Sequence, residues 1–209
     1  MSQAAQLAQG LAALSLQLPA GAESRLLDYL ELLQKWNKVY NLTAIREADQ
    51  MVSRHLLDSL SVLAHISGKR IIDIGSGAGL PGIALAIARP EASVCLLEVN
   101  HKKATFLQQA ITELGLRNAN VVANRVEEFR PATNFDVVIS RAFADLSEYV
   151  ALAGHLCTHD GVIVAMKGLH PFEELSQLPA NVVDKKVIRL EVPGLAAERH
   201  LVLMTLRAS

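Results

Sequence analysis

The sequence predicts an α/β protein with a mostly parallel, doubly wound sheet that ends in an antiparallel hairpin and carries a helical N-terminal cap. Leucines at helical spacing dominate the first part of the chain, whereas short β-rich apolar runs alternate with helix-like runs in the second part. The last two apolar runs are joined by a loop too short for a helix. We therefore expect a cap over residues 1–66 and one compact domain over residues 67–209.

The cap is expected to hold three helices. The first fits residues 4–18, and the second fits residues 26–40, where leucines recur every three or four positions. Trp36 and Tyr40 continue the second apolar face, so we expect both in the core. A third helix fits residues 49–66.

The second part of the chain is expected to form the sheet. Helices fit between the first strands, and strands joined in this way are parallel and covered on both faces. The final two runs flank a loop containing Pro193 and Gly194, so they should pair antiparallel. Such a sheet resembles that of the Rossmann-like class I methyltransferases. The expected strands are residues 71–74, 93–98, 120–123, 135–140, 162–167, 184–192 and 198–206.

Composition excludes several classes of protein. The 209 residues are 51% hydrophobic, which suffices for a sizeable core, and no apolar run approaches the ~20 residues of a membrane span. The formal net charge of −1 differs from that of a dedicated nucleic-acid binder, so any such contact should be a local patch. Two cysteines without C-x-x-C spacing indicate neither a disulfide framework nor a zinc site. We expect a cytoplasmic protein without a metal.

A glycine-rich loop follows the first expected strand. Gly75, Gly77 and Gly79 allow a sharp turn and a close approach of a ligand to the main chain. Pro81 then suits the first turn of a helix, whose free N–H groups would face the same place. Ligands of doubly wound sheets bind at this edge, so the loop predicts a cofactor site.

Two cofactors compete for the loop. Gly77, Gly79 and Gly82 satisfy the dinucleotide pattern G-x-G-x-x-G, and an NAD-dependent oxidoreductase therefore stays an alternative. Counted from the strand, however, the pattern is D-x-G-x-G-x-G, and a carboxylate at Asp73 suits the positively charged methionine part of S-adenosylmethionine. Glu98, at the end of the next strand, can accept hydrogen bonds from a ribose of either cofactor.

Beyond the second strand, further side chains are expected at the same edge of the sheet. Val126 and Glu127 follow the third strand, where an adenine ring can be held. Arg141 ends the fourth strand and Lys167 ends the fifth, so both cations should face the cofactor crevice. Phe143 is placed to stack on a substrate base, although an aromatic residue there also suits the core.

Seven segments together form a more specific pattern than the glycine loop alone. They are WNKVYNLTAIR (36–46), RHLLDSL (54–60), DIGSGAGLPGIALAI (73–87), RVEEF (125–129), SRAF (140–143), MKG (166–168) and ERHLV (198–202). In this order they resemble the RsmG, or GidB, family of bacterial small-subunit ribosomal RNA methyltransferases. The resemblance covers nearly the whole chain.

The resemblance implies methyl transfer from S-adenosylmethionine to N7 of a guanine in the decoding-region loop of 16S rRNA. A cofactor-sensing regulator of cell division without catalysis stays a further alternative. This chain has Ala84 where the family often has proline, and Glu98 where the family has aspartate. The implied cofactor contacts are Gly75, Leu80, Val126, Glu127 and Arg141.

Methylation at N7 suits the absence of an obvious acid or base. Guanine N7 carries a lone pair and no proton, so alignment by Arg141 and Lys167 should suffice. His55 and Asp58, three residues apart, are expected to brace the glycine loop rather than bind a metal. We expect a monomer that acts on 16S rRNA within the small ribosomal subunit. The candidate RNA contacts are Arg46, Arg54, Lys102, Lys103, Arg125, Phe143, Lys167, Arg199 and His200.

Overall fold

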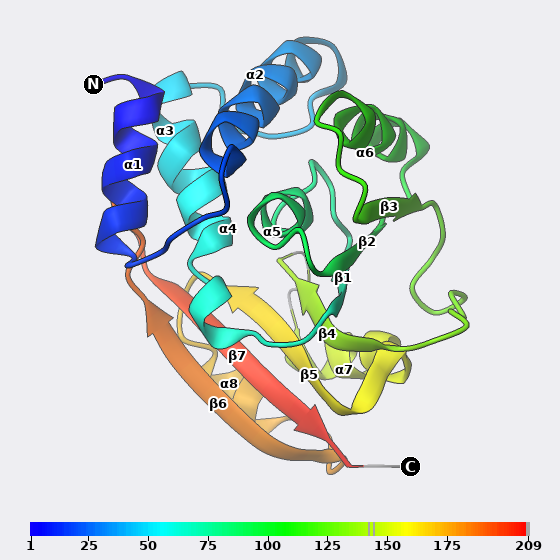
Figure 1. Ribbon diagram of the computed structural model, residues 1–209. Helices are drawn as coiled ribbons and strands as arrows, with labels where there is room; N and C mark the ends of the chain where they lie inside the picture. The colour runs from blue at the N-terminus through cyan, green and yellow to red at the C-terminus, as the bar shows by residue number, and fades with distance from the viewer. Residues whose placement is uncertain (142, 144, 208–209) are drawn as a thin grey trace.

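The centre of the computed structural model, which describes residues 1–141, 143 and 145–207, is a seven-stranded sheet (Figure 1). Its order is β3-β2-β1-β4-β5-β7-β6, with β7 antiparallel to both of its neighbours and the remaining pairs parallel. This confirms the predicted mostly parallel sheet and its antiparallel hairpin. The strands are β1 (Arg70–Ile74), β2 (Ser93–Leu97), β3 (Ala119–Val122), β4 (Phe135–Ser140), β5 (Cys157–Lys167), β6 (Val182–Leu190) and β7 (Arg199–Leu206).

Helices cover both faces of this sheet. Those before β3 lie on one face, and α7 and α8 lie on the other (Figure 1). The helices are α1 (Gln3–Ala13), α2 (Ala22–Tyr40), α3 (Ala48–Met51), the π-helix η1 (Val52–Leu57), α4 (Asp58–Leu60), α5 (Gly82–Ala88), α6 (His101–Glu113), α7 (Leu146–Ala153) and α8 (Phe172–Ser176), with short 3-10 turns at Leu63–His65 and Gly154–Leu156.

Alternating strand residues divide the core in two. Ile71 faces the helices of the cap together with α5 and α6, whereas Ile72 and Ile74 face α7 on the other side. This follows from the two-residue period of a strand, in which successive side chains point to opposite faces. Both faces of β1 are therefore buried.

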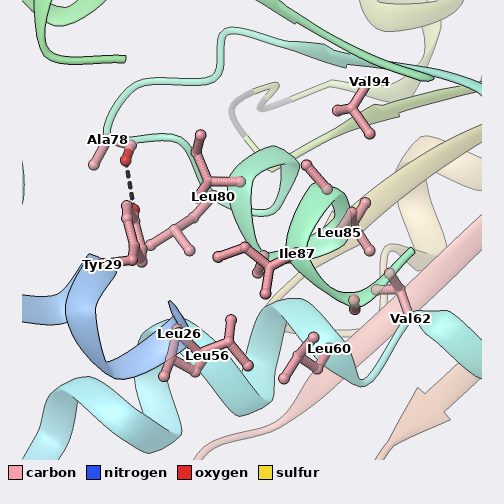
Figure 2. Packing of buried hydrophobic residues seen from close by; sticks show 14 of the residues in the cluster. Leu26, Tyr29, Leu56, Leu60, Val62, Ala78, Leu80, Leu85, Ile87 and Val94 are labelled. Atoms are coloured by element: carbon pink, nitrogen blue, oxygen red, sulfur yellow. Dashed lines mark hydrogen bonds between the residues drawn. The ribbon is translucent and has the colours of Figure 1, made fainter. Parts of the chain in front are cut away.

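The cap and the sheet share one of these cores. Leu26 on α2, Leu56 on η1 and Leu85 on α5 belong to the same buried cluster (Figure 2). The hydroxyl of Tyr29 on α2 donates a 2.5 Å hydrogen bond to the carbonyl oxygen of Ala78 in the glycine loop. The cap is thus attached to the loop directly, and the division at residue 66 stays a prediction.

The helical cap differs in detail from the sequence prediction. The first helix ends at Ala13 instead of residue 18, because Ser15 adopts a left-handed backbone with φ of 54°. The third helix is interrupted by the π-helix and gives way to a 3-10 turn near Leu63. Tyr40 is 44% exposed and stacks on the half-buried Trp36, so Tyr40 is not a core residue.

Helix length and hydropathy bear on membrane insertion. In the described part of the chain, no helix combines the length and the apolar character that crossing a bilayer requires.

Candidate active site

The glycine loop lies where β1 ends, and a carboxylate from the next strand holds it. Glu98 is buried, and its two oxygens accept hydrogen bonds of 2.8 Å from the backbone N–H groups of Gly77 and Asn100. Gly77 has φ of +58°, a conformation that favours glycine. Glu98 therefore lies beside the loop and fixes it, and its predicted contact with a ribose stays a prediction.

The Asp73 carboxylate does not point out of the loop toward a ligand. Its carboxylate is 1% exposed, and Oδ2 accepts a 2.9 Å hydrogen bond from the Gly82 N–H at the start of α5. Oδ1 is buried without a hydrogen-bond partner in the described residues. Burial raises the pKa of Asp73 to about 7, although the Gly82 N–H opposes this. Asp73 thus caps α5 beneath the loop, and its contact with a cofactor stays a prediction.

An apolar pocket opens at the carboxyl ends of β1, β2 and β3. Gly75, Val126 and Glu127, which the sequence predicts as cofactor contacts, all line it. Walls of this kind, with few polar groups, suit a nucleobase. We call this the apolar pocket, and it is lined by Ile74, Gly75, Leu97, Val99, Asn124, Arg125, Val126, Glu127 and Phe143.

Leu80, the remaining loop residue predicted to touch the cofactor, lies elsewhere. Its side chain is 3% exposed and packs in the core with Leu26 and Leu85 (Figure 2). The side chain is therefore not part of the apolar pocket. The predicted contact would have to involve its backbone.

A second pocket lies at the same edge of the sheet, beyond β4. Four of its lining residues are cations supplied by four separate elements, η1, the loop after β4, β5 and β7. We call this the cationic pocket, and it is lined by Thr43, Ala44, Ile45, Arg54, His55, Asp58, Arg141, Met166, Lys167, Gly168 and Arg199.

One buried carboxylate organises the cationic pocket. Asp58 is 1% exposed, and its two oxygens lie 3.3 Å from Arg141 Nη1 and 2.8 Å from Arg199 Nε. Both guanidinium groups are partly exposed and keep donors free for a ligand, because an arginine offers five N–H groups. Asp58 therefore sets the direction of two arginines.

This arrangement corrects the predicted bracing role of His55 and Asp58. Asp58 binds the two arginines, and His55 Nε2 lies 3.2 Å from Thr43 Oγ1. Burial lowers the pKa of His55 to about 4, and the charge of Arg141 adds to this effect. The π-helix carries His55, and π-helical turns occur frequently at functional sites.

The segment after β4 links the two pockets. Arg141 lines the cationic pocket, and Phe143 lines the apolar pocket two residues later. The Phe143 ring stacks on Tyr149 at 4.6 Å between centroids, and its carbonyl oxygen accepts a 3.2 Å hydrogen bond from Lys167 Nζ. Lys167 also pairs with Glu174 at 2.6 Å. Ala142, part of the segment SRAF, lies outside the described residues.

The predicted RNA contacts separate into three groups. Arg54, Lys167 and Arg199 meet in the cationic pocket, and Arg125 and Phe143 line the apolar pocket. Those that line neither are Arg46, Lys102, Lys103 and His200.

The predicted contact of His200 with RNA is wrong. Its side chain is 6% exposed, and Nδ1 lies 3.1 Å from the Gly168 carbonyl oxygen, so it offers little surface to RNA. Arg46 is exposed and donates a 3.1 Å hydrogen bond to Asn41 Oδ1. Lys102 and Lys103 lie in the first turn of α6. The contacts of these three with RNA stay predictions.

The sequence did not predict that Asp58 binds the two arginines, nor that Thr43 to Ile45 line the cationic pocket. The signal was available, because each quoted segment other than the glycine loop and RVEEF contributes a residue to the cationic pocket. The carboxylate between two arginines has no sequence signature, since its partners lie 83 and 141 positions away. Within the described residues, no group of three or more His, Cys, Asp or Glu side chains is placed to hold a metal ion.

Comparison with known proteins gives close relatives along the whole chain. A family model described as "GidB: rRNA small subunit methyltransferase G" matches residues 22–202. The protein named "Ribosomal RNA small subunit methyltransferase G" from Nitrosospira multiformis is 54% identical, with 98% of each chain covered. The protein of the same name from Laribacter hongkongensis is 55% identical, over 97% of this chain and 98% of that one.

Solved structures agree with the fold. The O-methyltransferase TomG from Streptomyces achromogenes, in complex with S-adenosylmethionine, has a TM-score of 0.60 at 19% identity and covers both chains fully. A putative O-methyltransferase from Klebsiella pneumoniae has a TM-score of 0.57 at 15% identity, over 86% of this chain and 90% of that one. These similarities identify the class I methyltransferase fold, and the family match argues against the dehydrogenase alternative.

Proposed function

Because this chain belongs to the rRNA small subunit methyltransferase G family, we propose that it methylates N7 of a guanine in the decoding-region loop of 16S rRNA. It is an S-adenosylmethionine-dependent methyltransferase. The observation that carries the proposal is the junction of two unlike pockets at Arg141 and Phe143. One pocket suits a nucleoside cofactor and the other suits an anionic nucleotide.

The residues of the apolar pocket fit S-adenosylmethionine. The adenine would lie against Val126 with the ribose near Glu98, and the methionine part would lie along the loop from Gly75 to Gly79. A Cβ built on Gly77 meets nothing closer than the Gly75 carbonyl oxygen at 3.8 Å, so this face of the loop is open. When bound, this cofactor supplies a methyl group on a positively charged sulfur.

The cationic pocket fits a nucleotide. Arg54 and Arg199 would hold phosphates, and Arg141 would bond the O6 side of the guanine or a phosphate. N7 needs no base to remove a proton, and both oxygens of Asp58, the buried carboxylate of the pocket, are held by arginines. The chain contributes alignment, which can supply ~7–11 kcal/mol of the barrier when the reacting atoms are held in line.

The substrate follows from this division. Reaching one base requires an unstacked nucleotide, and loops of RNA offer it at low cost. The net charge of −1 favours recognition of an assembled small ribosomal subunit over long-range attraction to naked RNA. We infer that the protein acts in the cytoplasm as a monomer.

The test is methyl transfer to small subunits from cells that lack the modification. Protein and labelled S-adenosylmethionine are incubated with these subunits, and the label is mapped by chemical cleavage at N7-methylguanosine. We expect label at one guanine, and less label on naked 16S rRNA. Label on another atom or on another RNA would overturn the substrate assignment, and tight cofactor binding with no transfer would favour a regulator.

A further inference from the structure

Two large apolar side chains are exposed just beyond the cationic pocket. Leu169 and Phe172 expose 76% and 74% of their surface. Leu169 lies in the connection between β5 and α8, which starts at Gly168, a lining residue of the cationic pocket, and Phe172 is the first residue of α8. Single exposed apolar side chains are common, but two of this size beside the cationic pocket mark a candidate contact surface.

The connection is tied to the cationic pocket through β7. The His200 ring bonds the Gly168 carbonyl oxygen and meets the His170 ring edge-on, with 5.3 Å between centroids. His200 follows Arg199, whose guanidinium lies in the pocket. Gly168 and His170, which flank Leu169, are therefore held next to the strand that carries Arg199.

Phe172 belongs to a supported turn rather than a loose loop. Its N–H donates to the His170 carbonyl oxygen at 3.0 Å, and its ring lies 3.8 Å from the His170 ring. Helix α8 is joined to α7, because Glu174 accepts a hydrogen bond of 2.9 Å from the Leu146 N–H. The Phe172 ring therefore contacts the His170 ring at a tilt of 31° and leaves most of its surface exposed.

We propose that Leu169 and Phe172 form a stacking surface for an unpaired RNA base that neighbours the target guanine. This inference rests on the proposed function and adds a contact outside both pockets. Aromatic rings stack on bases regardless of sequence, and single-stranded RNA is recognised in this way.

Charge distinguishes a base from a phosphate at this surface. Glu173 directly follows Phe172 and is exposed, so a phosphate would be repelled there. The cations Arg54, Arg141 and Arg199 lie in the neighbouring pocket and attract the phosphates instead. The RNA backbone would therefore follow the cationic pocket while a base covers Phe172.

The test compares Phe172→Ala with Phe172→Trp and with Val183→Ala. Val183 is 52% exposed on β6 and serves as a matched exposed apolar residue outside both pockets. We expect Phe172→Ala to raise KM for the rRNA substrate about 5- to 100-fold, in line with the loss of one stacked base. KM for S-adenosylmethionine and the melting temperature should stay unchanged. Phe172→Trp should retain activity, and Val183→Ala should resemble the wild type.

A fluorescence measurement gives direct evidence of stacking. The chain has one tryptophan, Trp36, which packs against Tyr40 and Phe106. In Phe172→Trp, a 16S rRNA fragment with the decoding-region loop should quench the added emission, relative to the wild type, at fragment concentrations at which a gel shift shows that the RNA is bound.

The outcomes separate the two proposals. Wild-type turnover together with unchanged KM in Phe172→Ala, or no added quenching in Phe172→Trp, overturns the stacking surface alone. An effect of Phe172→Ala on intact subunits but not on naked 16S rRNA assigns the surface to a ribosomal protein and also overturns it. Absence of methyl transfer by the wild type would remove the proposed function and this inference together.

Discussion

The apolar pocket and the cationic pocket lie at one edge of the sheet but are built by opposite means. At the apolar pocket, backbone geometry dominates, and the neighbouring glycine loop is held by the buried carboxylates of Asp73 and Glu98, which accept hydrogen bonds from backbone N–H groups. In the cationic pocket, side chains dominate, and the buried carboxylate of Asp58 holds two guanidinium groups. Buried carboxylates therefore fix the glycine loop beside the apolar pocket and orient two arginines in the cationic pocket.

This difference has consequences for robustness. Backbone hydrogen bonds depend on the fold as a whole, so a change in the apolar pocket should affect stability and cofactor affinity together. Arginine side chains can move once their anchor is lost, so a change in the cationic pocket should affect turnover with little effect on the fold. Substitutions in each pocket can test this separation.

The largest effect is expected from Asp58→Asn. Loss of the charge releases Arg141 and Arg199 from their fixed directions, and misplacement by about 1 Å can cost about 100-fold in rate. We expect methyl transfer to fall by about this factor while the Kd for S-adenosylmethionine changes little. Steady-state kinetics and calorimetry measure the two quantities.

The matched control for Asp58→Asn is Glu91→Gln. Glu91 pairs with Arg89 at 2.9 Å but is 55% exposed, so this substitution should leave activity unchanged. If Asp58→Asn weakens cofactor binding as much as turnover, the two pockets are not separate in the way described.

The next largest effect is expected from Gly82→Ala. A Cβ there would collide with the Leu96 side chain and lie 2.8 Å from Asp73 Oδ2. Overpacking of this kind lowers the free energy of unfolding by roughly 1–3 kcal/mol. Urea unfolding should show this loss, whereas Gly168→Ala, where a Cβ meets nothing within 4 Å, should unfold like the wild type. Equal stability of both variants would contradict the packing described beneath the glycine loop.

A smaller effect is expected from Tyr29→Phe. The substitution removes the hydrogen bond to Ala78 and leaves a buried carbonyl oxygen unsatisfied, at a cost of ~1 kcal/mol or somewhat more. Because this bond joins the cap to the glycine loop, cofactor Kd should rise by up to about fivefold, since 1.4 kcal/mol corresponds to tenfold.

Tyr149→Phe is the control for Tyr29→Phe. The Tyr149 hydroxyl donates to the Val138 carbonyl oxygen at 3.0 Å on the other face of the sheet. Its removal should cost similar stability and leave cofactor Kd unchanged. Equal shifts of Kd in both variants would show that the cap does not support the loop specifically.

The smallest expected effect is the dependence of stability on pH, because Asp73 and His55 change the free energy of unfolding in opposite directions. The pKa of Asp73 is raised to about 7 in the folded state, so its contribution to stability is lost as pH rises from about 4 to 7. The pKa of His55 is lowered to about 4, so its neutral folded form is disfavoured as pH falls from about 6.5 to 4.

The two contributions partly cancel in the wild type between pH 4 and 6.5. Relative to the wild type, Asp73→Asn should gain stability with rising pH over this range, and His55→Gln should lose it. Melting temperatures across the range measure both differences. Flat difference curves for both variants would show that neither group titrates abnormally.

The predictability of the two pockets follows from how they are encoded. The apolar pocket begins with one contiguous motif, so Gly75 and the position of Glu98 beside the loop could be predicted from strand ends and glycine spacing. The direction of the Asp73 carboxylate could not be predicted. The sequence does not show whether its oxygens accept hydrogen bonds from the N-terminus of α5 or from a ligand. The directions of the strands were predictable because the central strands are short apolar runs, although β5 begins before its apolar run and β6 is interrupted by charged residues.

The cationic pocket brings together positions that are far apart in the sequence, from Thr43 to Arg199. Several of its residues could be singled out from the sequence, but their meeting in one pocket could not be predicted. The ends of the cap helices were also missed. A left-handed Ser15 and a π-helix depend on packing, which overrides helical propensity over short stretches. His200 was assigned to the surface because strand alternation does not show that the β5–α8 connection covers it.

The central claim is that the cofactor occupies the apolar pocket and leaves the cationic pocket to the guanine nucleotide. A crystal structure with bound S-adenosylmethionine tests this most directly. We expect the adenine beside Val126, the ribose at Glu98 and the methyl group directed past Phe143 toward Arg141. A cofactor that contacts Arg54 and Arg199 inside the cationic pocket would contradict the account.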